Sequence, residues 1–389
     1  MTDLAALVAA EFPWTAEATF LNSASTGPLP ERSRRAVDAF NAKRATPYRL
    51  PDADLFAIFT ESRELAARLL NAEPREIALA TNTSYGLNLA ARALPLSAGD
   101  IVLVSDKEFP ANIYPWLALR KAGITVEVAP TTAEGWPDEA YLLRRLAEPR
   151  VKVLAVSLVQ FANGYKVDLA ALSAATRATG TWLVVDAIQG LGVEPVDVRR
   201  TPVDILSSGA QKWLLSPWGS GFTYIRRELI EQVDPMYVGW TAFEGTDDFS
   251  RMTEYSTAFR SDARRFEMIT LPFQDFVGMN ASLRMLMDVG IDRIAGHIRS
   301  LHRPLLDWAR ERGIRVASPV GGHASAIVCL APPDPQAAWA ALREARIYTS
   351  LREGAIRLSP HFYNTEADMS RVRDVLARTL QEKQHAVVR

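Results

Sequence analysis

The sequence predicts an α/β fold: a large domain with a mostly parallel seven-stranded sheet between helices, and a smaller α+β C-terminal domain. Between about residues 60 and 230, seven short apolar runs alternate with amphipathic, helix-like stretches. This alternation is typical of a parallel sheet with crossover helices. From about residue 275 the pattern changes to long helical stretches followed by short strands, which indicates the second domain.

The seven apolar runs are the expected strands of the sheet. Most of them are continuously apolar rather than alternating, as expected of strands that are covered on both faces. In chain order, they are residues 77–81, 100–105, 125–130, 151–158, 181–187, 204–210 and 221–227.

Helices are expected between and after these strands. In the large domain they are 84–94, 111–123 and 168–180, and the last two end in glycine, a common helix stop. The rest of the chain predicts a long helix over 275–313, strands over 315–319 and 325–331, and a helix over 334–346. Strands over 347–351 and 356–360 and a final helix from 365 complete it. We therefore expect the large domain over 18–275, and the small domain from 1–17 and 276–389.

Composition argues against several classes of protein. The 44 Lys and Arg residues balance 45 Asp and Glu, so neither nucleic acid nor an anionic membrane is expected as the main partner. Cys329 is the only cysteine, which rules out an intramolecular disulfide and a cysteine metal cluster, and fits a cytoplasmic location. The sequence shows no signal peptide and no transmembrane run.

The histidines also narrow the chemistry. All five lie in the last quarter of the chain. A Ser-His-Asp hydrolase or a histidine-rich metal site in the first three quarters is therefore not expected. We also expect no metal ion in the site. An enzyme with this sequence needs another proton carrier.

Polar residues follow two of the predicted strands. The segment 81–84, Thr-Asn-Thr-Ser, precedes a helix, and such a helix start suits a phosphate but equally an ordinary N-cap. Asp186 ends a buried strand, with Gln189 three residues later. A buried acid needs either hydrogen bonds from the loop or a function.

Lys212 and Phe109 also follow predicted strands. Burial would lower the pKa of Lys212 and free its amine as a nucleophile or base, although a lysine extending to solvent is the simpler interpretation of this residue alone. Phe109 either faces the same site or belongs to the core. Ligands of open parallel sheets bind beyond the carboxyl ends of the strands, so these residues are expected to lie together. Pyridoxal phosphate needs this set: a phosphate cradle, an acid at the ring nitrogen, an aromatic at the ring face, and a lysine that forms a Schiff base.

The chain resembles fold-type I, pyridoxal-phosphate-dependent enzymes of the class V aminotransferase superfamily, which includes cysteine desulfurases, kynureninases and isopenicillin-N-epimerase-like proteins. The resemblance extends from "LNSASTGPLP" (21–30) to "IRLSPHFYNTEADMSRV" (356–372). Its most specific motifs are "VVDAIQG", "SGAQKWLLSPWGSGF" and "REGAIRLSPHFYNTEAD". It implies pyridoxal 5'-phosphate as the cofactor, an amino acid as the substrate, and a homodimer with the site at the subunit interface.

The resemblance also implies roles for individual residues. Lys212 is expected to anchor the cofactor covalently and carry protons, Asp186 to face the pyridinium nitrogen, and Arg357 to bind the substrate α-carboxylate. Gln189 is expected at the phenolic oxygen, and Thr83 and Ser84 at the phosphate. Further cofactor-binding candidates are Asn82, Phe109, Ser208, Gln211, Trp240 and Thr241. The last two are expected either to pack at an interface or to serve their own or the neighbouring subunit's site.

The departures from the family pattern argue against a true cysteine desulfurase. The segment 347–357 contains no cysteine, and Cys329 lies in an apolar run typical of the core. Gln211 stands where many relatives have histidine. His361 is expected either to edge the pocket or to be a satisfied neighbour, and Arg265 to be structural.

The expected function is therefore an aminotransferase-type reaction on an α-amino acid. The runner-up is a lyase of the kynureninase or C–S type, or an epimerase. A non-catalytic relative is the alternative of another class, but such a protein would have lost Lys212, Asp186 or Arg357, and all three are present.

Overall fold

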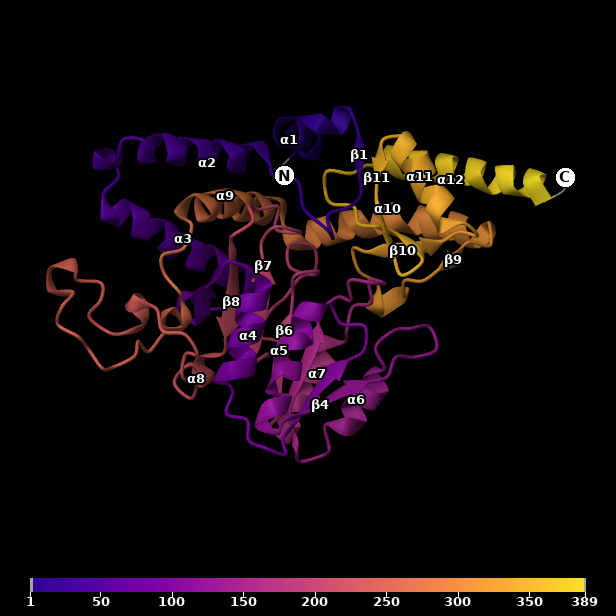
Figure 1. Ribbon diagram of the computed structural model, residues 1–389. Coiled ribbons are helices and arrows are strands. Elements are labelled where there is room, and N and C mark those ends of the chain that lie inside the picture. The colour runs from indigo at the N-terminus through magenta and orange to yellow at the C-terminus, as the bar shows by residue number, and fades with distance from the viewer. Residues whose placement is uncertain (1–2, 388–389) are drawn as a thin grey trace.

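The structure is a computed structural model that describes residues 3–387 of the chain (Figure 1). Its centre is a sheet with the strand order β2-β8-β7-β6-β5-β3-β4, in which β8 is antiparallel to β2 and β7 and the other pairs are parallel. The strands are β2 (Ile77–Leu79), β3 (Ile101–Ser105), β4 (Thr125–Ala129), β5 (Val151–Ser157), β6 (Trp182–Asp186), β7 (Ile205–Gly209) and β8 (Gly221–Ile225). The prediction of a mostly parallel seven-stranded sheet is confirmed.

Helices cover both faces of this sheet (Figure 1). In β3, Ile101 and Leu103 point into one core cluster while Val102 and Val104 point into another. The first cluster includes residues of α3 (Asp52–Leu70), α6 (Glu139–Arg145), α7 (Leu169–Thr179) and α9 (Phe273–Val289), and the second of α4 (Thr83–Ala93) and α8 (Arg227–Ile230). Burial on both sides explains why the strands are continuously apolar.

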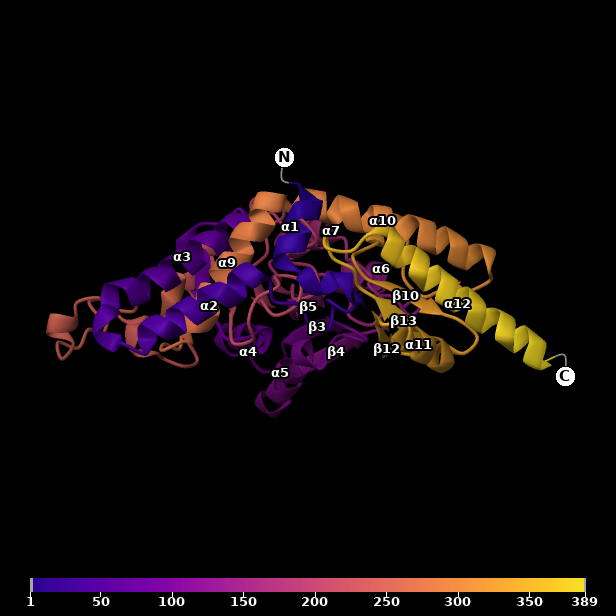
Figure 2. The same ribbon diagram turned by 90° about the horizontal axis from the view of Figure 1, so that it is seen from above.

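A second sheet, antiparallel and with the order β12-β13-β10-β9, lies in the C-terminal part. Its strands are β9 (Arg315–Val316), β10 (Val328–Ala331), β12 (Ser350–Arg352) and β13 (Ala355–Leu358). Helices α10 (Ile291–Glu311), α11 (Pro335–Glu344) and α12 (Glu366–Val387) accompany it, and Figure 2 shows α10 and α12 side by side. These elements share a core cluster of their own.

The N-terminal segment joins the two parts of the molecule. After α1 (Leu4–Glu11), strand β1 (Thr19–Phe20) pairs in parallel with β11 (Ile347–Tyr348) near the small sheet. The chain then returns, and α2 (Glu31–Arg44) packs against α9. The segment between β1 and α2 therefore passes between the two sheets. The division into 18–275 on one side and 1–17 with 276–389 on the other remains our proposal.

Three local predictions were wrong. The helix expected over 111–123 is a short α5 (Tyr114–Leu117) with 3₁₀ turns on both sides, because prolines at 110 and 115 lack the N–H groups that a longer helix needs. The helix expected over 275–313 is divided into α9 and α10 at Gly290, which has a φ of 92°. The strand expected over 347–351 is two strands, β11 and β12, which pair with different neighbours.

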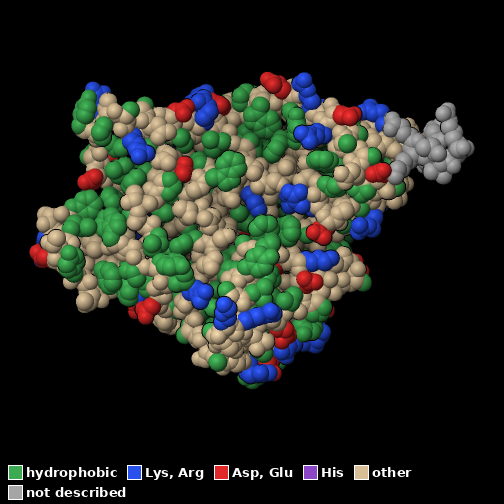
Figure 3. Space-filling model, viewed as in Figure 1, with side chains coloured by type: hydrophobic (Ala, Val, Ile, Leu, Met, Phe, Trp, Pro, Cys, Tyr) green, Lys and Arg blue, Asp and Glu red, His purple; other side chains and the backbone are tan. Residues whose placement is uncertain are grey.

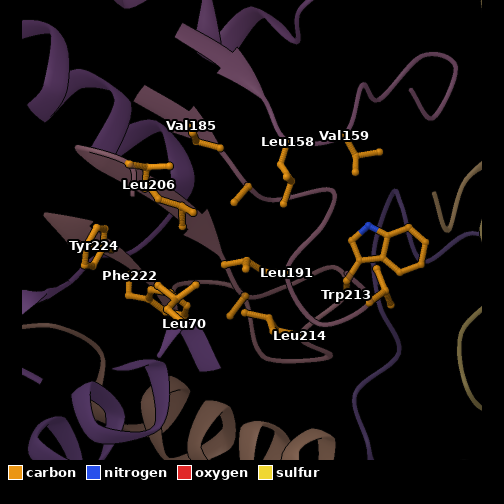
Figure 4. Close-up of a cluster of buried hydrophobic side chains, with 14 of the residues drawn as sticks. Leu70, Leu158, Val159, Val185, Leu191, Leu206, Trp213, Leu214, Phe222 and Tyr224 are labelled. Atoms are coloured by element: carbon orange, nitrogen blue, oxygen red, sulfur yellow. The ribbon is translucent and has the colours of Figure 1, made fainter. Parts of the chain in front are cut away.

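The core beneath the carboxyl ends of the central strands also holds the segment that follows Lys212. Figure 4 shows Trp213 and Leu214 of this segment in one cluster with Leu158, Val185 and other side chains of the sheet. Trp213 and Leu214 are each about 1% exposed. Their burial fixes the backbone that carries Lys212. Within residues 3–387, no helix has the length and apolarity needed to cross a membrane.

Candidate active site

Asp186 is the last residue of β6, a central strand of the large sheet, and its side chain is buried. One carboxylate oxygen, Oδ1, accepts a hydrogen bond of 3.1 Å from the backbone N–H of Ile188. The other, Oδ2, is buried and has no hydrogen-bond partner within residues 3–387. Burial raises the pKa of Asp186 to about 6, even though the charge of Lys212 acts in the opposite direction. A buried carboxylate oxygen without a hydrogen-bond donor destabilises a folded protein. Oδ2 is therefore suited to accept a hydrogen bond from a ligand.

Lys212 lies beyond the end of β7, in the loop that connects β7 to β8. Burial lowers its pKa to about 8, although Asp186 acts to raise it. Its Nζ lies 5.6 Å from the centre of the Phe109 ring, and it makes no hydrogen bond or ion pair with the residues that the structure describes. Phe109 is 44% exposed and stands edge-to-face with Phe161 at 5.3 Å between ring centres. The amine is therefore desolvated, partly neutral near pH 8 and close to an aromatic face.

The N-terminus of α4 approaches the same strand ends. Asn82 caps the helix, and its Oδ1 accepts a 3.0 Å hydrogen bond from the N–H of Tyr85. Thr83 Oγ1 accepts a 2.8 Å hydrogen bond from the N–H of Gly209, three residues before Lys212, while Ser84 is exposed. The N–H groups of the first helical turn have no intrahelical acceptors. The start of α4 thus offers donors and the positive end of the helix dipole near the lysine loop.

The other cofactor-binding candidates near Lys212 already have partners. Gln189 accepts a 2.9 Å hydrogen bond from the indole of Trp213 and donates one of 3.0 Å to the carbonyl of Ala24. Ser208 is buried and donates to the carbonyl of Gly209 at 2.9 Å. Gln211 is half-buried, and its backbone carbonyl, rather than its side chain, accepts a 2.9 Å hydrogen bond from the N–H of Gly27. Gln189 and Gln211 thereby link the lysine region to the N-terminal segment 24–27.

That segment lies directly against the lysine loop. A Cβ atom on Gly27 would lie 1.9 Å from the carbonyl oxygen of Lys212. Only glycine permits so close an approach. A side chain at this position would therefore displace the backbone of Lys212.

Arg357 is buried, at 2% exposure, in β13. Its guanidinium donates to the carbonyl of Phe161 at 2.9 Å, to Ser25 Oγ at 2.7 Å and to Ser350 Oγ at 3.2 Å. No carboxylate of the described residues lies within ion-pair distance of it, and burial lowers its pKa to about 10. Buried charges in proteins are normally paired. An unpaired buried guanidinium near Lys212 is therefore suited to a carboxylate from a ligand.

Three residues near the site were not identified from the sequence. Ser25 and Ser350 contact Arg357 from distant segments. Glu108, next to Phe109, is buried and accepts hydrogen bonds from Ser157, Asn112 and Gln160. Burial raises the pKa of Glu108 to about 7, and the nearby charge of Asp186 adds to this rise. The sequence signal for Glu108 was its position directly before Phe109, which was expected at the cofactor ring. Glu108 follows two other charged residues, however, and such a run is typical of an exposed turn.

Trp240 and Thr241 lie apart from this group. They line a cavity of about 390 Å³ together with Phe56, Phe249 and other residues of α3 and of the segment after α8. The Trp240 ring packs edge-to-face on Phe56 at 6.3 Å, and the hydroxyl of Thr241 is buried without a hydrogen-bond partner among the described residues. Within residues 3–387, no hydrogen bond or ring contact joins either residue to Lys212 or Asp186.

Three further side chains have structural partners. His361 Nε2 lies 3.0 Å from the carbonyl of Trp213, and its Nδ1 accepts a 2.8 Å hydrogen bond from the N–H of Phe362. Burial lowers the pKa of His361 to about 4, so it is a neutral, satisfied neighbour of the lysine loop. Cys329 is buried, and its thiol donates to the carbonyl of Ala162 at 3.3 Å. Arg265 donates to the carbonyl of Ile230 at 3.1 Å and lies over the ring of Phe259.

The raised pKa of Asp186 leads to a prediction about stability. The folded protein keeps a proton that the unfolded chain releases between about pH 4 and pH 6, so ionisation of Asp186 lowers the stability across this interval. Asp186→Asn removes that ionisation. We expect it to raise the free energy of unfolding of the cofactor-free protein at pH 7.5 by about 2–3 kcal/mol, as two pKa units imply. The difference between variant and wild type should grow from pH 4 to pH 6 and then stay constant.

Urea unfolding of the cofactor-free protein at a series of pH values measures this difference. The matched control is Asp288→Asn, because Asp288 is exposed, and its curve should follow the wild type. A variant Asp186→Asn that is less stable than the wild type at pH 7.5 would show that the carboxylate is well satisfied in the fold.

Residues 19–311 match the model of the family described as aminotransferase class-V. A probable cysteine desulfurase of Pseudomonas putida is 32% identical, with 93% of this chain and 94% of that protein covered. The uncharacterized aminotransferase YcbU of Bacillus subtilis is 30% identical, with 94% and 95% covered.

A solved structure shares the fold. It is a Lys-to-Ala mutant of the protein C-DES, with glycine covalently linked to its PLP cofactor. Its TM-score is 0.87 at 22% identity, with 97% of this chain and 99% of that chain covered. The predicted fold class is thereby confirmed at the level of the whole chain.

Proposed function

Because the chain belongs to the aminotransferase class-V family, we propose that it is a pyridoxal-phosphate-dependent enzyme that acts on an α-amino acid, with an aminotransferase-type reaction. The observation that carries the proposal is a pair of unsatisfied groups, one buried (Asp186) and one half-buried (Lys212). Oδ2 of Asp186 has no donor within residues 3–387, and Lys212 has a free amine beside an aromatic ring. Asp186 lies at the carboxyl end of β6 and Lys212 lies beyond that of β7, the edge where ligands of such sheets bind.

The residues fit this cofactor. Lys212 would hold it covalently, and Asp186 would accept the N–H of its pyridinium ring through Oδ2. The first turn of α4, with Thr83 and Ser84, would face its phosphate. Phe109 would pack on the ring. When bound, pyridoxal phosphate supplies an electron-accepting ring that stabilises negative charge at the substrate Cα.

Three side chains of this protein supply the other functions that the reaction needs. Asp186 would keep the nitrogen of the cofactor ring protonated, because its Oδ2 is free to accept that N–H. Lys212 moves the proton at the substrate Cα, because burial brings the pKa of its amine to about 8, close to neutral pH. Arg357 orients the amino acid by donating two hydrogen bonds to its α-carboxylate, a geometry that a guanidinium provides.

The runner-up is a lyase or an epimerase, since both begin with the same proton removal by Lys212. The relatives support both alternatives, since they include a probable cysteine desulfurase at 32% identity and an isopenicillin N epimerase at 28%. Two observations argue against persulfide chemistry: segment 347–357 has no cysteine, and burial raises the pKa of the Cys329 thiol to about 11. A reactive thiol needs a lowered pKa.

We further propose a cytoplasmic homodimer with the site at the subunit interface. Figure 3 shows hydrophobic side chains gathered on the part of the surface over α3 and the segment after α8. Exposed aromatics there include Tyr48, Tyr237, Trp240, Phe249 and Tyr255. Patches of this kind mark interfaces. In the dimer, Trp240 and Thr241 would serve the partner's site. The net charge of −1 supports neither nucleic acid nor an anionic membrane as a partner.

A spectral screen of amino acids tests the reaction type. Protein reconstituted with pyridoxal phosphate is mixed with single α-amino acids, and the absorption of the cofactor is followed. Conversion to the amine form of the cofactor, reversed by a 2-oxo acid, is the expected result. Release of pyruvate or sulfide without that conversion supports the lyase, and loss of optical rotation without it supports the epimerase.

A further inference from the structure

Arg352 lies on the same face of a β-hairpin as Arg357. Strands β12 and β13 are joined by a turn at Glu353 and Gly354, with φ angles of 46° and 72°. In the register of the hairpin, Ser350 lies opposite Arg357 and Arg352 lies opposite Ala355. Residues two apart in a strand point to the same face, so Ser350 and Arg352 share theirs with Arg357. The 3.2 Å contact between Ser350 and Arg357 agrees with this arrangement.

The guanidinium of Arg352 has no acidic partner among the described residues. Within the described part of the chain it donates one hydrogen bond, of 2.8 Å, to the carbonyl of Leu351, and it forms no ion pair with Glu353, the next residue. Other exposed arginines, such as Arg315, likewise form no ion pair among the described residues, so Arg352 is distinguished by its position on the face of Arg357. The positive charge of Arg352 is therefore not neutralised by an acid, and it lies at the edge of the face that carries Arg357.

This charge acts on the candidate site. The positive charge of Arg352 lowers the pKa of both Arg357 and Lys212, which come from different elements. Asp186 and Glu108, the acids nearest to the site, are buried and already face Lys212, Ser157 and Gln160. Around the place of the substrate, the three cations Lys212, Arg352 and Arg357 therefore outnumber the two acids.

We propose that the substrate is a dicarboxylic amino acid, with its α-carboxylate on Arg357 and its side-chain carboxylate on Arg352. The proposal rests on the proposed function, because it assigns the second arginine of the same site. A diagonal pair on one face of a hairpin spans about 7–8 Å between the backbones, and two long guanidinium side chains bridge this separation to the two ends of a four- or five-carbon diacid. A monocarboxylic amino acid would leave Arg352 without a partner.

The test uses the cofactor-loaded enzyme and unreactive diacids. Calorimetry measures the binding of succinate and glutarate, and of acetate and butyrate as single-carboxylate references. The variants are Arg352→Gln, Arg352→Lys to keep the charge, and Arg315→Gln as the matched control. Arg315 is also exposed, and it lies in β9, at the opposite edge of the same sheet.

We expect the wild type to bind the diacids more tightly than the monoacids, and Arg352→Gln to weaken diacid binding by about 10- to 100-fold, the range of one hydrogen-bonded charge pair. Monoacid binding should change less than about twofold. Arg352→Lys should retain part of the preference, and Arg315→Gln all of it. Reaction rates with L-aspartate and L-glutamate should fall in Arg352→Gln, while those with L-asparagine and L-glutamine should not.

Equal diacid binding by the wild type and Arg352→Gln would overturn the proposal and make Arg352 a solvated surface side chain. An enzyme that takes up the cofactor but reacts with monocarboxylic amino acids as fast as with acidic ones contradicts this proposal alone. A protein that takes up no pyridoxal phosphate contradicts the proposed function, and the substrate assignment with it.

Discussion

Replacing Lys212 with alanine will lower turnover of the amino acid substrate by at least about 10³-fold, within the range that a positioned acid–base group contributes. The reason is that the structure offers no substitute. Among the residues that the structure describes, no other lysine lies in the loop between β7 and β8, and His361 is neutral and bonded to its neighbours. The loss should appear in kcat, because the amine carries the proton at Cα rather than binding the substrate carboxylate.

Steady-state rates with the best substrate of the amino acid screen measure this loss. Because Lys212 is half-buried next to the buried Trp213, the variant must be shown to fold, and its thermal midpoint should stay within a few degrees of the wild type. Lys152→Ala is the control, since Lys152 is a half-buried lysine of β5, and it should retain wild-type turnover. A Lys212→Ala enzyme with more than a tenth of the wild-type kcat would show that another group carries the proton.

Replacing Arg357 with alanine will weaken amino acid binding far more than cofactor binding. Truncating one partner of a buried, hydrogen-bonded charge pair costs about 2–5 kcal/mol, so we expect KM to rise at least about 30-fold. The affinity for pyridoxal phosphate should change by less than about threefold. The guanidinium contacts Ser25, Ser350 and the carbonyl of Phe161 but neither Asp186 nor the start of α4, so the cofactor positions should keep their own contacts.

Because the same guanidinium also joins three segments, part of the loss has a structural origin. Arg357→Lys keeps the charge and separates the two effects, since a lysine cannot bind a carboxylate with two parallel hydrogen bonds. Arg226→Ala, which removes a structural ion pair with Asp204, should lower the thermal midpoint without changing KM. Equal losses of cofactor and substrate affinity in Arg357→Ala would contradict the assignment.

The central sheet could be predicted almost completely from the sequence. All seven strands are present, because strands buried on both faces leave continuous apolar runs of the observed length. The helix errors arose where a single residue decides the outcome: Pro115 breaks the segment after β3, and Gly290 divides α9 from α10. The pairing of β1 with β11 was not predictable, because each strand has only two residues and they are far apart in the sequence.

Some residues of the candidate site could likewise be identified from the sequence, and others could not. Asp186, Lys212 and Thr83 were identified because each follows or precedes a strongly patterned strand or helix. Ser25, Ser350 and Glu108 were missed because their roles depend on contacts between distant segments, such as that of Ser25 with Arg357. Arg352 was not identified from the sequence. Its direction is set by the hairpin register, which no local pattern of the sequence reveals.

The most direct test of the account is chemical trapping of the cofactor on the wild-type protein. Protein loaded with pyridoxal phosphate is reduced with borohydride and digested, and the peptide that carries the cofactor is identified by mass spectrometry. The account predicts a single labelled peptide that contains Lys212, and no label in Lys212→Ala. Label on a different lysine, or no uptake of pyridoxal phosphate by the wild type, would contradict it.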